Sequence, residues 1–241
     1  YAEFVPFCRK KLQRLIVPYI FVSAFWVVPF SVYFFDLSMK DVFIKYVLAT
    51  SPSQLWFVWM LFDVFLLAWI VSDKLYASNK FAVAMTLFLL LMGIIGGKLF
   101  SNVFCIWTAC RYFIYFVIGF KIRQYGMGTV RRISPVLWIV LYVCLYVLMV
   151  YVSDCGGVIG KVFNTLLSIV VSTTGAVMAF VVLMEIARKV AWQNNQYFIA
   201  FSKRTMPIYL LHQQLIYVSI SIFNGVFNPY MNVAINIAVA L

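Results

Sequence analysis

Hydrophobic residues form long stretches along this chain, separated by short polar segments. The hydrocarbon core of a bilayer is about 30 Å thick, which takes about 20 apolar residues as a helix, and a helix satisfies its own backbone hydrogen bonds there. The pattern therefore predicts an all-α fold, a polytopic transmembrane helix bundle with seven complete spans and a truncated eighth. The seven spans are expected at residues 15–35, 55–72, 81–97, 103–120, 135–152, 162–184 and 205–223.

The same pattern bears on the ends of the chain and on its domains. An eighth apolar stretch begins near Met231 and reaches only Leu241, which is too short to cross a bilayer. The first residue is Tyr1, and no leader-like segment precedes the first apolar run. Because no soluble stretch or long linker interrupts the spans, we expect a single integral membrane domain over residues 1–241, truncated at both ends.

Composition supports the membrane class and narrows the chemistry. Hydrophobic residues make up 65% of the chain and charged ones 11%, against roughly 45–50% and about 25% in soluble domains. The five cysteines are scattered singly, without a CxxC spacing. We therefore expect no metal site and no disulfide framework.

The Lys and Arg residues predict the orientation, because cytoplasmic loops retain them. Most of the 19 lie at one set of alternate ends, beginning with the basic cluster at residues 9–14. The first span is therefore expected to run outward from the cytoplasm. The net charge of +12 needs no nucleic-acid partner, and it would also attract an anionic cytoplasmic ligand. The opposite ends hold only Lys40, Lys45, Lys98 and Lys161.

The loop after the first span contains "LSMKDVFIKYVLATSP". Ser38 and Asp41 have the spacing of a capping box, and the apolar residues at 42, 43, 46 and 47 share a helical face. This favours a short interfacial helix on the outer side, with an irregular loop as the alternative. Pro29, within the first span, is expected to kink that helix.

Charged groups inside a bilayer are costly and usually face a protein interior or a water-filled cavity. Asp63 and Arg111 each lie ten residues, about 15 Å, from the cytoplasmic ends of their spans. His212, the only histidine, is eight residues past Arg204, which is about 12 Å. We therefore predict one polar level that includes Tyr209, in which Asp63 and Arg111 contact each other or share a polar partner. The alternative is an ion pair that only joins two helices, with His212 donating to a neighbouring carbonyl.

A second group of candidate residues opens the first span. Lys11 and Arg14 are three residues apart, so they share a helical face just below the membrane and could hold phosphates of a cytoplasmic ligand. The alternative is ordinary positive-inside anchoring. No motif of a soluble enzyme occurs: GxSxG, P-loop, HExxH and glycine-rich dinucleotide turns are all missing from the sequence.

Four segments together resemble the acyltransferase 3 family, whose members acylate cell-surface carbohydrates and other exported molecules. They are "FCRKKLQRLIVPYIF" with its basic pair before Pro-Tyr, "SQLWFVWML", "RYFIYFVIGFKIR" and "FSKRTMPIYLLH" with its Ile-Tyr-Leu-Leu-His ending. Their order and spacing cover most of the chain. The resemblance implies a helix bundle, with no bound cofactor, that transfers an acyl group, usually acetyl, from cytoplasmic acyl-CoA to a glycan hydroxyl.

The resemblance also assigns roles to residues and departs from the family in two places. It implies that Lys11 and Arg14 bind acyl-CoA, although Lys11 stands where the family prefers Arg. The family's catalytic histidine lies on a helix before this basic pair, so we expect it upstream of Tyr1, with His212 in a supporting role. The implied setting is a bacterial cytoplasmic membrane, with lipid, acyl-CoA and a carbohydrate or lipid-linked glycan as partners. A carrier for lipid-linked sugars and a non-catalytic membrane subunit remain the alternative functions.

Overall fold

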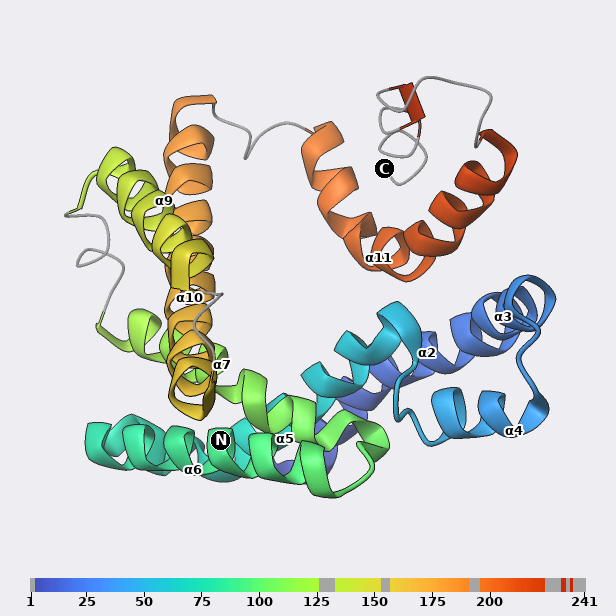
Figure 1. Cartoon of the computed structure of the whole chain (residues 1–241), viewed down its shortest axis with the longest axis horizontal. Coiled ribbons are helices and arrows are strands. Elements are labelled where there is room, and N and C mark those ends of the chain that lie inside the picture. Colours follow the sequence, from blue (N-terminus) through green and yellow to red (C-terminus); the bar gives the residue numbers. More distant parts are fainter. Residues whose placement is uncertain are drawn as a thin grey trace. The chain divides into compact units, whose positions relative to one another are not determined.

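The computed structural model describes residues 3–125, 133–152, 157–190, 196–223, 231–232 and 235, and these residues form helices joined by short turns (Figure 1). The chain divides into two compact units, one of residues 1–117 and 202–241 and the other of residues 118–201. The predicted single membrane domain stays a prediction. The residues that line the pocket described below, from Thr50 to Tyr112, all lie in the first unit.

The seven predicted spans are confirmed as helices long and apolar enough to cross a membrane. The first begins well before residue 15, because the basic cluster continues the helix instead of preceding it. The predicted eighth span lies largely outside the described residues. The seven helical stretches are Phe4–Phe35, Ser53–Ala77, Asn79–Leu99, Val103–Tyr125, Pro135–Val152, Phe163–Arg188 and Thr205–Phe223.

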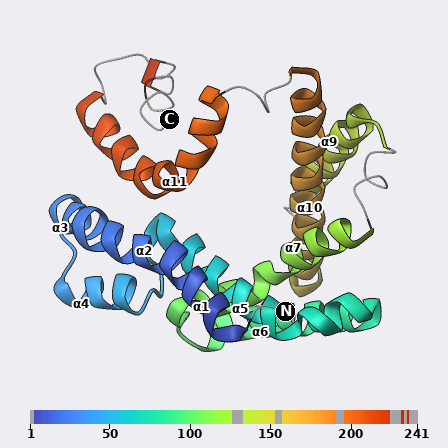
Figure 2. The same cartoon turned by 180° about the vertical axis from the view of Figure 1, so that it is seen from behind.

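The first span is one continuous line of helix (Figure 2), and it contains two π-turns. It runs through α1 (Phe4–Lys11), a π-turn (Leu12–Ile16), α2 (Val17–Val22), a second π-turn (Ser23–Val27) and α3 (Val28–Phe35). Each π-turn directly precedes a helix whose second residue is a proline, Pro18 or Pro29. Proline lacks the backbone donor and crowds the carbonyl four residues earlier, so the preceding turn widens. The kink predicted at Pro29 is thus a π-turn, and Pro18 has another.

A short helix follows the first span, as the capping pattern predicts. It consists of α4 (Met39–Val42) and a π-turn (Phe43–Val47). The backbone N–H of Asp41 donates to Ser38 Oγ at 3.2 Å, and the Ser38 hydroxyl donates to the Asp41 carboxylate at 2.6 Å. The Ser38 hydrogen bond holds the pKa of Asp41 below its ordinary value. Of the apolar face, Tyr46 is buried, whereas Phe43 and Val47 are exposed.

Tyr46 ties this helix to the first span. Its carbonyl accepts a hydrogen bond of 2.6 Å from the Tyr19 hydroxyl, and its own hydroxyl lies 2.9 Å from Ser31 Oγ. Tyr19 and Ser31 are buried. Burial raises the pKa of the Tyr46 phenol above its ordinary value. The two hydrogen bonds therefore fix the segment that follows, from residue 48 onward, relative to the first span.

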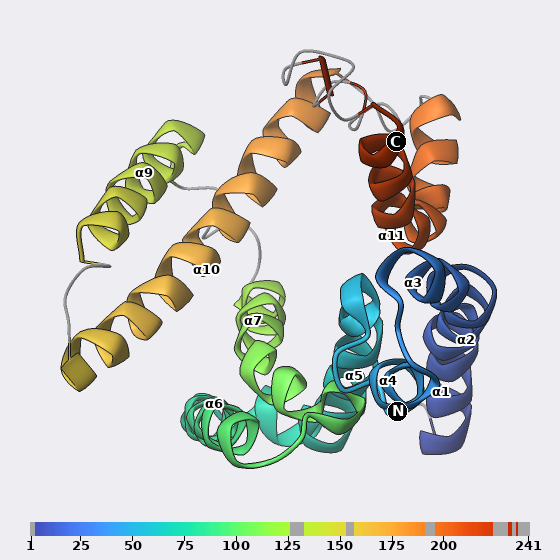
Figure 3. The same ribbon diagram turned by 45° about the vertical axis from the view of Figure 1, so that its right-hand side comes forward.

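The central helix of the first unit is α5 (Trp56–Ala77), which follows a 3₁₀ turn (Ser53–Leu55). It packs against the first span on one side and against α6 (Asn79–Leu99) on another (Figure 3). A second 3₁₀ turn (Val103–Cys105) leads into α7 (Ile106–Tyr125). The main buried cluster joins α5 to the first span and to α11 (Gln196–Phe223) through residues that include Tyr19, Val58, Phe62 and Leu210.

The second unit contains a pair of helices, α9 (Pro135–Val152) and α10 (Gly157–Val190), which pack side by side (Figures 1 and 3). A close contact at Gly175 helps to explain their packing. A side chain there would begin 2.8 Å from the Tyr142 ring. Small residues at such crossings let helices approach each other.

Candidate functional site

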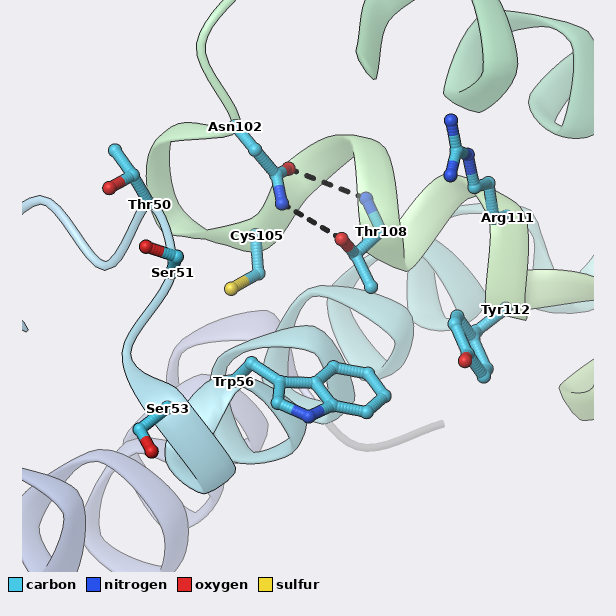
Figure 4. Close-up of a pocket in the computed structure, with 9 residues that line it drawn as sticks. All are labelled: Thr50, Ser51, Ser53, Trp56, Asn102, Cys105, Thr108, Arg111 and Tyr112. Atoms are coloured by element: carbon cyan, nitrogen blue, oxygen red, sulfur yellow. Dashed lines mark hydrogen bonds between the residues drawn. The ribbon is translucent and has the colours of Figure 1, made fainter. Parts of the chain in front are cut away.

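A pocket of about 400 Å³ lies where the turns before α5 and α7 meet (Figure 4). Both turns belong to the ends of spans that the charge pattern places away from the cytoplasm. We call it the Arg111 pocket, after the charged residue in its wall. Its lining residues are Thr50, Ser51, Ser53, Trp56, Asn102, Cys105, Thr108, Arg111 and Tyr112.

Hydrogen bonds fix the two turns that form the pocket. The Asn102 side chain accepts from the backbone N–H of Trp107 at 3.0 Å and donates to the Thr108 hydroxyl at 2.8 Å, which caps the start of α7. The backbone N–H of Phe104 donates to the Leu48 carbonyl at 2.8 Å, and this bond joins the two turns. The pocket walls are thus held by contacts of the protein with itself.

The backbone around the pocket is strained. Five described residues other than glycine have positive φ, and four of them line or flank this pocket: Ala49, Ser53, Phe104 and Cys105, with φ between 48° and 59°. Such conformations are unfavourable for residues with a side chain, at about 1–3 kcal/mol each, and they cluster at functional sites. The strain thus singles this region out as a candidate site.

Arg111 is held against α6. Its Nε donates to the Gly93 carbonyl at 2.9 Å. Gly93 permits this approach, because a Cβ there would lie 2.7 Å from both Arg111 Cγ and the Trp107 carbonyl oxygen. Gly96 faces the Trp107 ring in the same way, and Gly97 lies beside the guanidinium. These glycines were not among the predicted site residues, although the GxxxG spacing of Gly93 and Gly97 is typical of a contact between helices.

The predicted contact between Asp63 and Arg111 is wrong for the structure described. Asp63 on α5 lies near Cys105 and Cys110. Its carboxyl group is close enough to interact electrostatically with both thiols. One carboxyl oxygen, Oδ2, is buried and has no hydrogen-bond partner in the described part of the chain. Cys110 is buried whereas Arg111, one residue on, is exposed, so the two side chains leave α7 on different sides. Depth alone could not reveal this, because consecutive helical residues differ by about 100° in direction.

Tyr209 and His212 also lie apart from Asp63. The Tyr209 hydroxyl donates to the Gln54 carbonyl, and its ring packs against Phe57 at 5.6 Å between centroids. Farther along α11, Gln214 Oε1 accepts a hydrogen bond of 2.7 Å from Gln54 Nε2. α11 therefore meets the first turns of α5, not the level of Asp63. No hydrogen bond among the described residues joins Tyr209 or His212 to Asp63 or Arg111.

The His212 ring has one committed nitrogen. Its Nδ1 lies 2.7 Å from the Tyr209 carbonyl oxygen and 3.2 Å from that of Ile208. Carbonyl oxygens only accept, so we assign the proton of the neutral ring to Nδ1. Nε2 then carries the lone pair, and no hydrogen bond within the described residues uses it. The alternative in which His212 donates to a neighbouring carbonyl is therefore correct for Nδ1. Nε2 remains able to accept a hydrogen bond.

The buried pair of Gln54 and Gln214 leads to a stability prediction. Replacing Gln214 by leucine leaves the Gln54 amide without its partner, and we expect a loss of about 1–3 kcal/mol of unfolding free energy. Gln213→Leu is the control, since it removes only an exposed bond to Tyr217. Unfolding of the two variants in detergent measures the difference. Equal stability of the two would show that the buried bond contributes nothing.

Lys11 lies against α5, the helix of the second span. Its Nζ is 3.5 Å from the centroid of the Phe65 ring on α5, a cation–π contact. Phe65 is two residues, about 3 Å of rise, from Asp63. Lys11 is half-buried and Arg14 exposed, and the two charges repel each other electrostatically. The predicted role of Lys11 and Arg14, holding the phosphates of a cytoplasmic ligand, stays a prediction.

Comparison with known families and proteins complements this geometry. The sequence pattern of the acyltransferase 3 family, described as an acyltransferase domain, matches residues 1–241, the whole of this chain. Searches of curated proteins and of solved structures gave no match. The family agrees with the seven apolar helices of a multi-pass membrane protein. This chain therefore belongs to the acyltransferase 3 family of membrane acyltransferases.

Proposed function

We propose that this protein moves an acyl group, most simply acetyl, from acyl-CoA on the cytoplasmic side to a hydroxyl of a cell-surface or exported carbohydrate. Family membership makes it a membrane acyltransferase. The donor, the acceptor and the direction across a bacterial cytoplasmic membrane are the proposal. In the transfer, the acceptor oxygen bonds to the acyl carbon and the carbon–sulfur bond breaks. The acceptor proton passes through a base to the departing CoA thiolate.

The observation that carries the proposal is the placement of two different polar groups along α5. Its first residue, Trp56, lines the Arg111 pocket, and Phe65 holds the Lys11 ammonium. Nine residues of helix separate them, about 14 Å. A cation suits the phosphates of coenzyme A, whereas a pocket of hydroxyl and aromatic groups suits a carbohydrate. The long arm of coenzyme A can bridge such a distance, because its thioester lies far from its phosphates.

His212 has a supporting role in this proposal. Nδ1 is occupied by the Tyr209 carbonyl, so Nε2 is available to accept a hydrogen bond from the acceptor hydroxyl. That bond would orient the hydroxyl toward the thioester carbon. A positioned reactant reacts faster because less orientational freedom remains to be lost in the transition state.

Acyl-CoA binding tests the donor site. We expect Lys11→Ala and Arg14→Ala each to weaken acetyl-CoA binding by the full-length protein by about 10-fold or more, because a hydrogen bond to a charged phosphate contributes about 1.5–3 kcal/mol. Arg9→Ala and Lys10→Ala are the controls, since both residues are exposed in the same cluster. Calorimetric titration in detergent measures the affinities. Unchanged affinity in both test variants would mean that Lys11 and Arg14 only anchor the helix at the membrane surface.

Transfer itself is tested with the full-length protein in vesicles. Acetyl-CoA labelled in its acetyl group is supplied at the face that bears residues 9–14, and carbohydrate acceptors at the other. The expected result is labelled ester on the carbohydrate. Movement of a lipid-linked sugar without labelled ester would instead identify a carrier, and neither product in an intact, folded preparation would favour a non-catalytic subunit.

A further inference from the structure

We propose that the Arg111 pocket binds a sugar unit that carries an anionic group, a carboxylate or a phosphate, on the carbohydrate acceptor. The inference rests on the proposed function for the identity of the acceptor. It adds a site for that acceptor and a chemical preference. The residues that carry it are Ser51, Ser53, Trp56, Arg111 and Tyr112.

The pocket has the surface that a sugar ring requires. A pyranose has apolar C–H faces and a rim of hydroxyls, so it needs aromatic faces together with hydrogen-bonding groups. The rings of Trp56 and Tyr112 are in contact, with centroids 5.4 Å apart and planes at 51°, and both line the pocket (Figure 4). The hydroxyls of Ser51, Ser53 and Tyr112 make no hydrogen bond within the described residues, so they are available to a ligand.

The Arg111 guanidinium adds the charge preference. It lies within an apolar span, where an isolated charge is costly. No carboxylate within the described residues pairs with it, and Asp63 lies near Cys105 and Cys110. Because Nε is bound to the Gly93 carbonyl, the side chain is oriented, and its two terminal amino groups make no hydrogen bond within the described residues. A planar pair of N–H donors matches the two oxygens of a carboxylate or phosphate.

The size and rigidity of the pocket also fit such a ligand. About 400 Å³ is within the range of about 300–1,000 Å³ that small-ligand sites occupy, so the pocket holds one or two sugar units. The bond between Phe104 and Leu48 and the Asn102 cap hold its walls before any ligand arrives. A prearranged site loses less conformational freedom on binding. The strained residues Ser53 and Cys105 belong to this fixed wall.

Binding of small glycosides by the full-length protein in nanodiscs tests the proposal. Methyl glucuronide and methyl glucoside share a ring and differ in the carboxylate. Their dissociation constants are measured by saturation-transfer NMR without acyl-CoA. We expect the glucuronide to bind about 10-fold more tightly or better, with a preference that shrinks as salt rises. Equal binding of the two glycosides, or a preference insensitive to salt, would overturn the proposal.

Substitutions in the pocket test which residue causes the preference for the glucuronide over the glucoside. Arg111→Gln is expected to abolish the preference for the glucuronide, and Trp56→Leu to weaken the binding of both glycosides alike. Arg123→Gln, which alters an exposed arginine on the same helix, is expected to change neither. Should Arg111→Gln fail to fold because its bond to Gly93 is lost, Arg111→Lys keeps the charge without the fork. Arg111→Lys should then retain a smaller preference, and a full preference in either variant would contradict the site.

Two further arms separate this inference from its alternatives. Nanodiscs of neutral and of anionic phospholipid are compared, and glucuronide binding that disappears only in anionic lipid would assign the pocket to a lipid phosphate and overturn the proposal. Acyl transfer is then assayed with neutral and acidic glycans. Equal acyl transfer to neutral and acidic glycans would refute this inference but not the proposed function. Preferential binding of the glucuronide without any acyl transfer would support the pocket and refute the proposed function.

Discussion

Replacing Gly93 by alanine is expected to destabilise the protein strongly, by about 1–3 kcal/mol or more. The new Cβ would lie 2.7 Å from the Trp107 carbonyl oxygen and 2.9 Å from the Arg111 backbone nitrogen. Backbone atoms of a helix cannot move aside as a flexible side chain can. α6 and α7 would therefore have to separate, which would also break the hydrogen bond from Arg111 to the Gly93 carbonyl.

Gly119 provides the matched control on α7. A Cβ there meets no atom within 4 Å, so Gly119→Ala changes the same chemistry in open space. Because alanine favours the helix over glycine by about 1 kcal/mol, this variant should be as stable as the unmodified protein or slightly more so. Thermal unfolding in detergent, followed by size-exclusion chromatography, compares the two. Equal stability of Gly93→Ala and Gly119→Ala would mean that the close approach of α6 and α7 is not required.

Replacing His212 by leucine is expected to lower acyl transfer by about 10-fold or more, whereas His212→Gln should keep a substantial part of it. Leucine offers no acceptor in place of Nε2, and a lost orienting bond of about 1.4 kcal/mol corresponds to a tenfold rate. Glutamine can still accept and donate, although it cannot serve as a base. Rates are measured with labelled acetyl-CoA in the complete protein, together with donor binding and unfolding temperature.

The pH profile distinguishes orientation from proton transfer at His212. If the imidazole only orients a substrate, His212→Gln keeps the pH dependence of the unmodified enzyme. Gln213→Leu, the neighbouring change, should leave rate and profile as they are. Complete loss of transfer in His212→Gln, with normal folding and donor binding, would instead make His212 the base of the reaction.

The missed and mistaken features share a geometric origin. The contact proposed for Asp63 and Arg111 came from their equal depth, but depth specifies the position along each helix and not the direction of a side chain. That direction depends on which helix lies alongside. Arg111 points to Gly93 because α6 approaches α7 there, and the approach depends on the lack of a Cβ at that position. The pair of Gln54 and Gln214 was equally hidden, since its partners are 160 residues apart in the chain.

The sequence by itself determined the seven apolar helices, the Ser38 cap and the family to which the chain belongs. These follow from local properties, because the length of an apolar run, the spacing of a cap and the order of short motifs are all contained in neighbouring residues. Only the tertiary structure decided that the turns before α5 and α7 enclose a pocket with Arg111 in its wall. That pocket depends on hydrogen bonds and close packing between segments distant in the chain, which no local pattern records.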